Sequence, residues 1–377
     1  MRVLIVHPGI YVYGGAELLI VKLANYMTKR GIKNALLTTS ILPEMRNALD
    51  RTEIIIQEKS KIPFDFSEFN EILALHKGIR DNLNDFDVIN VNNYPAELSI
   101  FPYHKPVVWM CNEPILYLIS KHKLSPLPRL KNKTLLTFDK FIVKYYIKYA
   151  VVADEFNAER FKRIYGFRPE IINYGMDYEF FSKGDKKRAL KRFNLFDNFI
   201  VLQVGMLTPF KNQMESIKTI EKLRGKIPNI KLVLAGLGEK GYTTILKKYA
   251  KERKLEQNMI FTGHLSRESV RDLYHACDIL LHPIKPQGGW LAPFEALCAK
   301  KTIVVSTEMT ASDIVEREKI GIVTDDFTET IWDIYNNSDK YNEIAERGQA
   351  WVKKNLSWEK FCEKMVKLFY KAIERGE

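Results

Sequence analysis

The sequence predicts an α/β protein built from two parallel-sheet domains placed end to end. Short, continuously apolar strands alternate with amphipathic helices, which is the pattern of βαβ units whose sheet is buried on both faces. The pattern starts twice, at residue 2 and again near residue 199, after the charged stretch 182–193. The length of 377 residues also suits two ordinary domains better than one.

The first half opens with a βαβ unit. In order, we expect a strand at 2–6, a loop with two glycines at 11–17, an apolar-periodic helix at 18–29 and a strand at 34–40. Further short strands are expected at 87–93, 106–111 and 149–154. Together these elements predict a first domain over residues 1–180.

The second half repeats this order of elements. We expect a strand at 199–205, a loop at 208–213, a helix at 214–226 and later strands at 231–236, 259–263, 278–283 and 302–306. They predict a second domain over residues 190–350, with the boundary between residues 175 and 195. The last helix, within residues 357–377, is expected to pack back on the first domain.

The composition favours a protein of a reduced, cytosolic setting. The four cysteines lie far apart and show no metal-ligand spacing, which argues against structural zinc. No apolar run reaches the roughly 18 residues of a membrane-spanning helix, and a strand rather than a signal peptide opens the chain. The formal charge of +12 favours an anionic partner: nucleic acid, a phosphate-bearing small molecule or an acidic lipid surface. No recognised nucleic-acid-binding motif accompanies this charge.

Two glycine-containing turns are candidate phosphate sites. Gly205 lets a ligand approach the backbone, and Lys211 lies at the start of the next helix, where free N–H groups and the helix dipole favour an anion. A solvated lysine at a helix start would give the same pattern. In the first domain, the pair Gly14 and Gly15 permits backbone N–H groups to face a diphosphate, but it also fits plain turn geometry. No G-x-G-x-x-G follows the first strand, which argues against NAD.

A third candidate site lies within residues 287–306. Pro293 suits a first helical position, which would place Glu295 in the first turn of the helix. A carboxylate at that place can accept two hydrogen bonds from the vicinal diol of a ribose. It can also simply complement the helix dipole.

The order of these sites resembles that of the retaining glycosyltransferases of family 4. The motifs that carry the resemblance run along nearly the whole chain: GGAE near the start, NYGMD at 173–177, VGMLTPFKNQ, LVLAGLGE, IFTGHLS, LYHACDILLHP and QGGWLAPFEALCAKKTIVVS. The resemblance implies an α/β protein of the GT-B fold, in which two Rossmann-like domains face each other across an interdomain cleft.

The resemblance also implies roles for individual residues. The turn at Gly14 and Gly15 would lie against the donor phosphates and the acceptor, and Lys211 would neutralise the diphosphate. Glu295 would hold the ribose, while the backbone at Leu291 and Ala292 would face the phosphates. Apart from the resemblance, His264 is a candidate to line the cleft near the donor because it follows Gly263, although a structural histidine fits this position at least as well.

Three positions depart from the family pattern. Gln287 stands where the family places a glutamate that faces the donor sugar, so hydrogen bonding persists without the charge. Met206 replaces an arginine that accompanies the phosphate lysine. Asn112 occupies the place of a histidine near the sugar and keeps hydrogen bonding without imidazole chemistry. Its neighbour Glu113 is either a local substitute or a plain loop carboxylate.

The implied activity is a metal-independent transfer of a hexose-type sugar, with retention, from a UDP- or GDP-linked donor to a glycan or polyprenyl-linked acceptor. The acceptor hydroxyl would attack on the face from which the nucleoside diphosphate leaves, with the leaving group stabilised electrostatically. The candidate catalytic residues are Lys211, Gln287, Asn112 and Glu113. A sugar-nucleotide epimerase and a nucleotide- or glycan-binding protein without catalysis are the alternatives.

Two further stretches bear on metals and membranes. The acids of Asp85-Phe86-Asp87 fit a turn before a strand better than a metal site, so neither a metal nor a cofactor is expected. Residues 121–150 hold eight lysines or arginines against one aspartate, interleaved with apolar side chains. Such a surface could lie on anionic lipid at the cytoplasmic face of a membrane and bring a lipid-linked acceptor to the cleft. A solvated helix face has the same composition.

Overall fold

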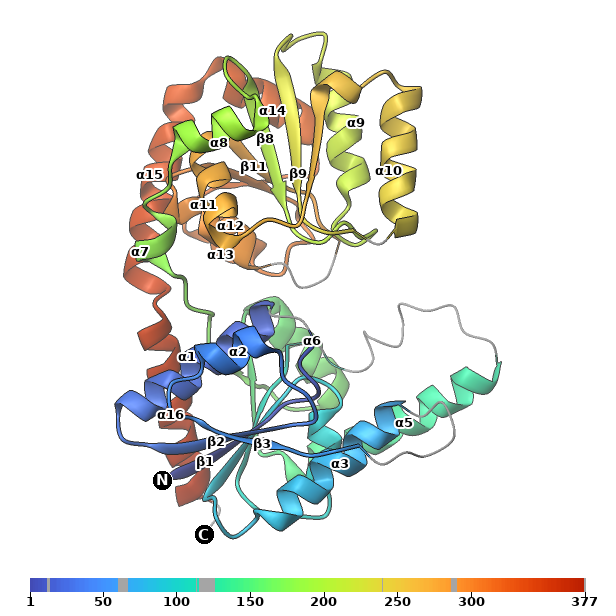
Figure 1. The fold of residues 1–377 in the computed structure, drawn as a ribbon, viewed down its shortest axis with the longest axis vertical. Coiled ribbons are helices and arrows are strands. Elements are labelled where there is room, and N and C mark those ends of the chain that lie inside the picture. The colour runs from blue at the N-terminus through green and yellow to red at the C-terminus, as the bar shows by residue number, and fades with distance from the viewer. Residues whose placement is uncertain are drawn as a thin grey trace. The chain divides into compact units, whose positions relative to one another are not determined.

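The computed structural model of the protein describes residues 1–11, 14–59, 67–112, 114, 126–238, 240–285 and 290–375. The chain divides into two compact units (Figure 1). Unit 1 comprises Met1–Tyr174 and Trp358–Glu377, and unit 2 comprises Gly175–Ser357. At the start of unit 2, the N–H of Met176 donates to the carbonyl of Leu356 (2.8 Å), near the end of the same unit. Residues 175–180 therefore belong to unit 2.

Unit 1 is built on a parallel sheet. Within its described residues, seven strands pair in the order β3-β2-β1-β4-β5-β6-β7. The strands are β1 (Arg2–Val6), β2 (Lys33–Thr38), β3 (Glu53–Ile56), β4 (Val88–Asn92), β5 (Val107–Met110), β6 (Tyr149–Val152) and β7 (Glu170–Ile171). The apolar runs that predicted a sheet buried on both faces are therefore confirmed as parallel strands.

Helices cover both faces of this sheet. They are α1 (Gly15–Lys29), α2 (Pro43–Ala48), α3 (Ser67–Asp81), η1 (Ala96–Ile100), α5 (Pro126–Tyr146), α6 (Glu155–Tyr165) and α16 (Trp358–Glu374). Alternate residues of β1 face opposite layers: Val3 packs in one core with α1 and α16, whereas Leu4 packs in another with α3, α5 and α6. The last helix lies against α1 through Phe361 and Phe369, which share the core of Ile20.

Unit 2 repeats the plan. Within its described residues, six strands pair in the order β10-β9-β8-β11-β12-β13. The strands are β8 (Phe199–Val204), β9 (Ile230–Ala235), β10 (Met259–Gly263), β11 (Ile279–His282), β12 (Thr302–Val305) and β13 (Ile322–Val323). The helical elements are α7 (Tyr178–Phe181), α8 (Lys186–Phe193), α9 (Gln213–Leu223), α10 (Lys240–Glu252), η2 (Glu256–Asn258), α11 (Arg267–Ala276), α12 (Leu291–Cys298), α13 (Ser312–Arg317), α14 (Phe327–Asn336) and α15 (Ser338–Asn355).

The strand order locates the places where each unit can bind a ligand. In unit 1 the order runs outward in both directions from the β1/β4 pair, and in unit 2 it does so from the β8/β11 pair. In open parallel sheets, ligands bind beyond the carboxyl ends of the strands at such a reversal. The residues that follow β1, β4, β8 and β11 are therefore the first candidates for function.

Candidate functional site

Two glycines shape the loops that follow β8 and β9. Gly205 (φ +141°) and Gly236 (φ +154°) have backbone conformations that other residues rarely adopt. A Cβ atom on Gly236 would lie 2.1 Å from the carbonyl oxygen of Gly205, so the loops meet more closely than any larger residue permits. A Cβ atom on Gly205 would lie 3.9 Å from Cδ and Cε of Lys211. The Lys211 side chain therefore lies across this glycine.

Lys211 is held immediately before helix α9. Its N–H donates to the carbonyl of Thr208 (3.0 Å), and its own carbonyl accepts from Nε2 of Gln203 (2.7 Å). Gln203 is buried in β8, and the hydroxyl of Ser216 donates to its Oε1 (2.7 Å). The ammonium group thus stands at the carboxyl end of a central strand and at a helix N-terminus, which is where an anion is favoured.

Helix α12 begins earlier than the sequence predicted. Leu291 is its first residue, so Pro293 is the third, and Glu295 lies beyond the first turn. The expectation that Pro293 begins the helix and that Glu295 lies in its first turn is therefore wrong, and the alternative that Glu295 only complements the dipole of that turn falls with it. Trp290 adopts a helical backbone conformation before Leu291, and its ring stacks on Phe294 with a centroid distance of 4.4 Å. This apolar contact extends the helix upstream of the proline.

Glu295 is oriented by a tyrosine of the neighbouring helix. The hydroxyl of Tyr274, in α11, donates to Oε2 of Glu295 (2.8 Å), and Tyr274 itself is fully buried. Burial raises the pKa of Glu295, while the hydrogen bond from Tyr274 and the charge of Arg267 limit the rise. Arg267 in turn pairs with Asp177 (2.7 Å) from the start of unit 2. One carboxylate oxygen of Glu295 is therefore fixed within the protein.

Three more predicted positions lie at strand ends or helix starts of unit 2. Leu291 and Ala292 are the first residues of α12, where backbone N–H groups have no partner within the helix. His264 is exposed and directly follows Gly263, whose carbonyl accepts from the N–H of Gly236 (3.1 Å). His264 is thus adjacent to the glycine loop that contacts Gly205.

The three remaining positions to report are Gln287, Glu113 and Met206. Gln287 and Glu113 lie outside the described residues. Met206 is 58% exposed, and its backbone carbonyl accepts from Nε2 of Gln213 (3.0 Å). The side chain that replaces the family arginine therefore points to solvent and supplies no charge.

In unit 1 a carboxylate occupies the glycine turn. Gly14 caps α1, and its N–H donates to Oε2 of Glu17 (2.9 Å), while Gly15 is the first residue of the helix. Gly14 has φ −108°, a conformation open to any residue, so backbone geometry alone does not require glycine there. The N–H that the sequence assigned to a phosphate is thus already bonded to an anion of the protein.

Asn112 belongs to a directional chain of hydrogen bonds at the carboxyl ends of β1, β4 and β5. Tyr174 donates to Oδ1 of Asn112 (2.6 Å), and Nδ2 of Asn112 donates to Oδ1 of Asn93 (2.6 Å). Nδ2 of Asn93 lies 2.9 Å from Nε2 of His7, whose Nδ1 lies 2.8 Å from the carbonyl of Pro8. Since Pro8 offers only an acceptor, the proton sits on Nδ1 and Nε2 accepts from Asn93. Burial lowers the pKa of His7, which keeps the ring neutral.

Glu71 braces the loop that follows β1. This buried carboxylate of α3 accepts from the N–H of Gly9 (2.8 Å) and from the hydroxyl of Thr39, and it pairs with Lys59. It thereby ties the ends of β1 and β2 to a helix. The sequence offered no indication of this brace.

Asp87, the second acid of Asp85-Phe86-Asp87, has a structural role. Asp87 accepts from the backbone N–H of Arg2 (2.8 Å) and pairs with its guanidinium (2.9 Å). The side-chain hydrogen bond from Arg2 holds the pKa of Asp87 below its usual value. Asp87 lies just before β4, at the amino ends of the strands, whereas the candidate site lies at their carboxyl ends. This position agrees with the turn interpretation.

Two family models match this chain. The one described as Glycosyltransferase Family 4 matches residues 13–180, and the one described as Glycosyl transferases group 1 matches residues 185–351. The chain belongs to glycosyltransferase family 4. The resemblance drawn from the motifs is thereby confirmed.

Curated relatives of this family 4 chain match it in part. It is 24% identical over 232 residues to a GDP-mannose-dependent monoacylated alpha-(1-6)-phosphatidylinositol monomannoside mannosyltransferase of Corynebacterium glutamicum, covering 57% of this chain and 60% of that protein. It is 22% identical over 262 residues to the putative glycosyltransferase YtcC of Bacillus subtilis, covering 65% and 61%. The chain thus spans about 60% of the length of these relatives.

Solved structures resemble the family 4 chain over nearly its whole length. HepE from Anabaena, solved in complex with UDP, superposes with a TM-score of 0.80 at 18% identity and covers 98% of this chain and 100% of that one. Sucrose-phosphate synthase from Thermosynechococcus elongatus superposes with a TM-score of 0.80 at 16% identity, with 99% of each chain covered. These likenesses confirm the α/β fold of the GT-B class with its two Rossmann-like units.

The sequence predicted Lys211, Glu295 and Asn112 as site residues of this family 4 chain but did not predict the side chains that hold two of them. Tyr274 donates to Glu295, and Tyr174 and Asn93 hold Asn112. A signal for Asn93 was present, because two polar residues after the apolar run of β4 place an amide at the carboxyl end of a central strand. The tyrosines carried no such signal, since either would also pack as an ordinary core residue.

Proposed function

We propose that the protein is a glycosyltransferase that moves a sugar from a UDP- or GDP-linked donor to a hydroxyl acceptor, with retention of anomeric configuration. The observation that carries the proposal is the set of side chains at the carboxyl ends of the unit 2 strands. Lys211 lies across Gly205 after β8, and Glu295 is oriented by Tyr274. A cation suits a diphosphate, and a fixed carboxylate suits the diol of a ribose.

The named relatives support this choice of donor class. The Corynebacterium glutamicum relative is named as a GDP-mannose-dependent mannosyltransferase, and Anabaena HepE has been solved with UDP-glucose. For the present chain we propose that the first N–H groups of α12, at Leu291 and Ala292, share the diphosphate with Lys211. His264, adjacent to the glycine loop, then faces the donor. Gln287 is proposed to hydrogen-bond the transferred sugar.

The proposed mechanism is electrostatic. The bond between the anomeric carbon and the diphosphate oxygen breaks, and its electron pair leaves with the diphosphate. The acceptor oxygen bonds to the same face of that carbon and gives its proton to the departing diphosphate oxygen, so atoms and charge balance. Lys211 and the α12 N–H groups stabilise the charge that develops on the leaving group. This route uses no protein nucleophile and no metal ion.

The acceptor is assigned to unit 1. The amide of Asn112 is fixed at both ends by Tyr174 and Asn93, so it presents one remaining N–H in a defined direction. Such an amide can orient a sugar hydroxyl but cannot take up its proton. Glu113 is retained as a candidate for orienting the same hydroxyl, whose proton passes to the departing diphosphate oxygen. Gly14 also stays a candidate contact, provided that the Glu17 carboxylate turns away from its N–H when a phosphate arrives.

We further propose that α5 places the acceptor side on an anionic membrane surface. Exposed residues recur at helical spacing along and just beyond α5: Lys133, Thr134, Thr137, Lys140, Phe141, Lys144, Tyr145 and Lys148. They include four lysines, and no acid is exposed among the described side chains of this helix. Phe141 and Tyr145 are 43% and 58% exposed, which suits rings that insert among lipid headgroups. Among the described residues, no helix has the length and apolarity to cross a bilayer.

Vesicle sedimentation tests the membrane surface. With vesicles that contain anionic lipid, the wild type should sediment, and the joint change Lys140→Glu with Lys144→Glu should release most of it. Charge reversal at Lys218 and Lys222 on α9 of unit 2 is the matched control. Equal sedimentation of all three proteins would contradict the proposal.

Product analysis tests the activity itself. The protein is incubated with UDP- and GDP-linked sugars and with glycan or polyprenyl-phosphate acceptors, and the anomeric configuration of the product is read by NMR. The proposal expects a glycoside with the configuration of the donor. A changed sugar nucleotide without transfer would indicate an epimerase. Donor binding without any turnover would favour the non-catalytic alternative, for which the uncharged Met206 is the specific observation.

A further inference from the structure

Unit 2 contains a cavity whose lining residues differ from those proposed to bind the donor. A cavity of about 360 Å³ lies between α8 and α11. Its lining residues are Arg188, Ala189, Arg192, Phe193, Glu268, Ser269, Arg271 and Asp272. None of these residues has a part in the proposed transfer. Three arginines line this one cavity, and their guanidinium groups differ in the partners they have.

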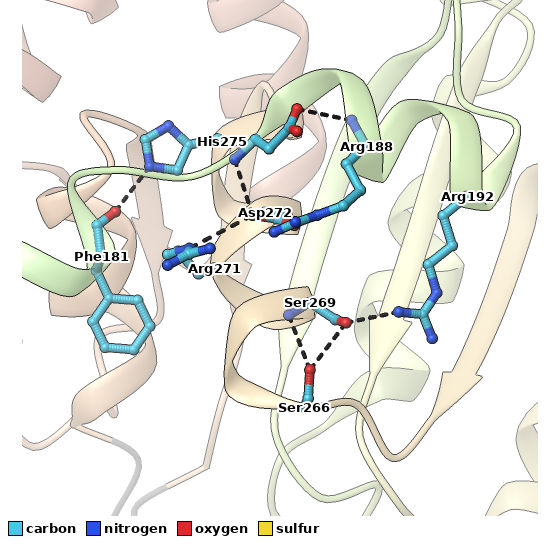
Figure 2. Close-up of polar contacts among 9 residues, drawn as sticks. Phe181, Arg188, Arg192, Ser266, Ser269, Arg271, Asp272 and His275 are labelled. Carbon is cyan, nitrogen blue, oxygen red and sulfur yellow. Dashed lines mark hydrogen bonds and ion pairs between the residues drawn. The ribbon is translucent and has the colours of Figure 1, made fainter.

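One of the arginines neutralises a buried carboxylate. Asp272 is 3% exposed and accepts from Nε of Arg188 (2.5 Å) and from the N–H of Asp185 (2.9 Å) (Figure 2). Burial acts against its charge, but these hydrogen bonds keep the pKa of Asp272 below its usual value. Nε of Arg271 lies 3.5 Å from the same carboxylate. The charge of Asp272 is therefore already balanced and does not oppose an anion in the cavity.

The remaining guanidinium donors are mostly uncommitted. Arg188 donates to Asp272 from Nε, and among the described residues its two terminal nitrogens have no hydrogen-bond acceptor. Arg192 stands one turn further along α8 and makes one hydrogen bond, from Nη1 to the hydroxyl of Ser269 (2.7 Å) (Figure 2). Both side chains come from one face of the helix because their positions differ by four. Their forks thus border the same space.

The local charges favour an anion in that space. Helix α8 reads KKRALKRF, with five cations and no acid. Ser269 lies in the first turn of α11, a helix of ten residues whose N-terminus carries partial positive charge. Glu268 is the one further carboxylate of the lining. The backbone N–H of its own turn and the Ser266 hydroxyl stabilise its charge and hold its pKa below the usual value, so Glu268 stays ionised. Three arginines against the two carboxylates leave the lining with one net positive charge.

We propose that the α8–α11 cavity binds a phosphate group of a phosphorylated ligand, at a site separate from the donor site. The terminal nitrogens of Arg188 and Arg192 supply the hydrogen bonds, since arginine forks match the oxygens of a phosphate. The hydroxyl of Ser269, which accepts from Arg192 and lies 3.1 Å from the hydroxyl of Ser266, holds the Arg192 fork in place. A purely structural role would explain Arg188, which holds Asp272. A structural role of this kind does not explain why Arg192 borders an open cavity. The phosphate is carried either by a soluble molecule or by a lipid headgroup.

The test measures anion binding to the full chain. Calorimetry with inorganic phosphate and with glucose 6-phosphate covers soluble ligands. Sedimentation of the Lys140→Glu, Lys144→Glu variant with vesicles of phosphatidic acid covers lipid without the proposed contribution of α5. The proposal expects saturable binding in at least one arm, and the arm that binds identifies the carrier. The same binding should persist in Lys211→Ala, which separates this cavity from the donor site and from the fate of the proposed transfer reaction.

Variants decide whether the cavity is responsible. Arg192→Gln and Ser269→Ala should each weaken binding at least tenfold while leaving the thermal midpoint close to that of the wild type. Lys187→Ala is the matched control, because it removes the same charge from the same helix outside the lining. The proposal is overturned by an absence of saturable binding in both arms, or by a loss in Lys187→Ala as large as that in Arg192→Gln.

Discussion

The hydroxyl of Tyr274 lies 2.8 Å from Oε2 of Glu295 and joins helix α11 to helix α12. The tyrosine is fully buried, and burial raises its pKa well above its ordinary value, so it stays protonated and acts as the donor. One carboxylate oxygen of Glu295 is therefore committed to the protein, and the other is left to meet a ligand. Tyr274, which the sequence did not single out, thus sets the direction of the proposed contact between Glu295 and the ribose.

Removal of this hydroxyl should weaken nucleotide binding and shift its pH dependence. Tyr274→Phe takes away a hydrogen bond to a charged group, worth about 1.5 to 3 kcal/mol, so we expect at least tenfold weaker binding of the cognate nucleoside diphosphate. The bond from Tyr274 lowers the pKa of Glu295, which burial raises. Without it the carboxyl should stay protonated to higher pH. Calorimetry between pH 4.5 and 8 should therefore show the acid limb of binding moved upward in the variant; an unmoved limb would contradict this role.

The contact between the two glycine loops predicts a stability effect. Gly236→Ala places a Cβ atom where the carbonyl of Gly205 stands and adds strain at φ +154°. We expect a loss of about 1 to 3 kcal/mol in the free energy of unfolding, together with weaker nucleotide binding. Gly241→Ala is the control, because a Cβ atom there meets no atom within 4 Å and the residue lies in helix α10. If urea unfolding gives the two variants the same free energy of unfolding, the close contact between the Gly205 and Gly236 loops does not limit stability, and the prediction is wrong.

The hydrogen-bond chain of unit 1 predicts a change in a histidine. In Asn93→Asp the group beside Nε2 of His7 becomes an acceptor, so the ring must carry a second proton to keep that hydrogen bond. We expect the pKa of His7, which burial now lowers, to rise by more than one unit. NMR titration of the imidazole measures it. An unchanged pKa would mean that Asn93 does not donate to this ring.

A buried acid pair predicts how the stability of unit 1 varies with pH. Glu97 and Asp139 are both fully buried, and neither forms a salt bridge among the described residues. Burial raises the pKa of Asp139 from 3.8 to about 7 and that of Glu97 well above its usual value. Both groups keep protons that the unfolded chain releases, so their contribution is full below about pH 4 and is lost as the pH rises toward 7 and beyond.

The variant Asp139→Asn should flatten this decline, because an amide does not titrate. The measurement is the urea midpoint of the first unfolding transition between pH 4.5 and 8, with the exposed Asp81→Asn as control. A wild-type midpoint that rises with pH over this range, or an Asp139→Asn profile parallel to that of the wild type, would show that the buried carboxyl is not the cause.

The fold followed from local patterns because each pattern expresses one physical requirement. The apolar run at β8 is needed for a strand buried on both faces, and the periodicity of α9 is needed to cover the sheet that contains β8. Lys211 was found for the same reason, since the loop after a central strand and the helix start are visible in a single stretch of sequence.

Contacts between distant segments were beyond such reasoning. Tyr274 meets Glu295 across 21 positions, and Tyr174 meets Asn112 across 62. In both pairs the partner is chosen by the packing of separate elements, which no local pattern records. The start of α12 was misjudged for a related reason. Proline suits the first position, but stacking of Trp290 on Phe294 extends the helix two residues further upstream.

The central claim, that unit 2 binds a nucleoside diphosphate through Lys211 and Glu295, is tested most directly by calorimetry. UDP, GDP and ADP are titrated in the presence of EDTA, and the nucleotide that binds is then compared with its 2′-deoxy form. The account predicts one preferred nucleotide, tenfold or greater weakening by Lys211→Ala and by Glu295→Ala, and no change in Lys218→Ala on the exposed side of α9. It also predicts that the wild type binds the 2′-deoxy form more weakly than the parent nucleotide, whereas the Glu295→Ala variant binds the two forms with equal affinity. A folded protein that binds none of the three, or that binds one with the same affinity after both substitutions, would contradict the claim.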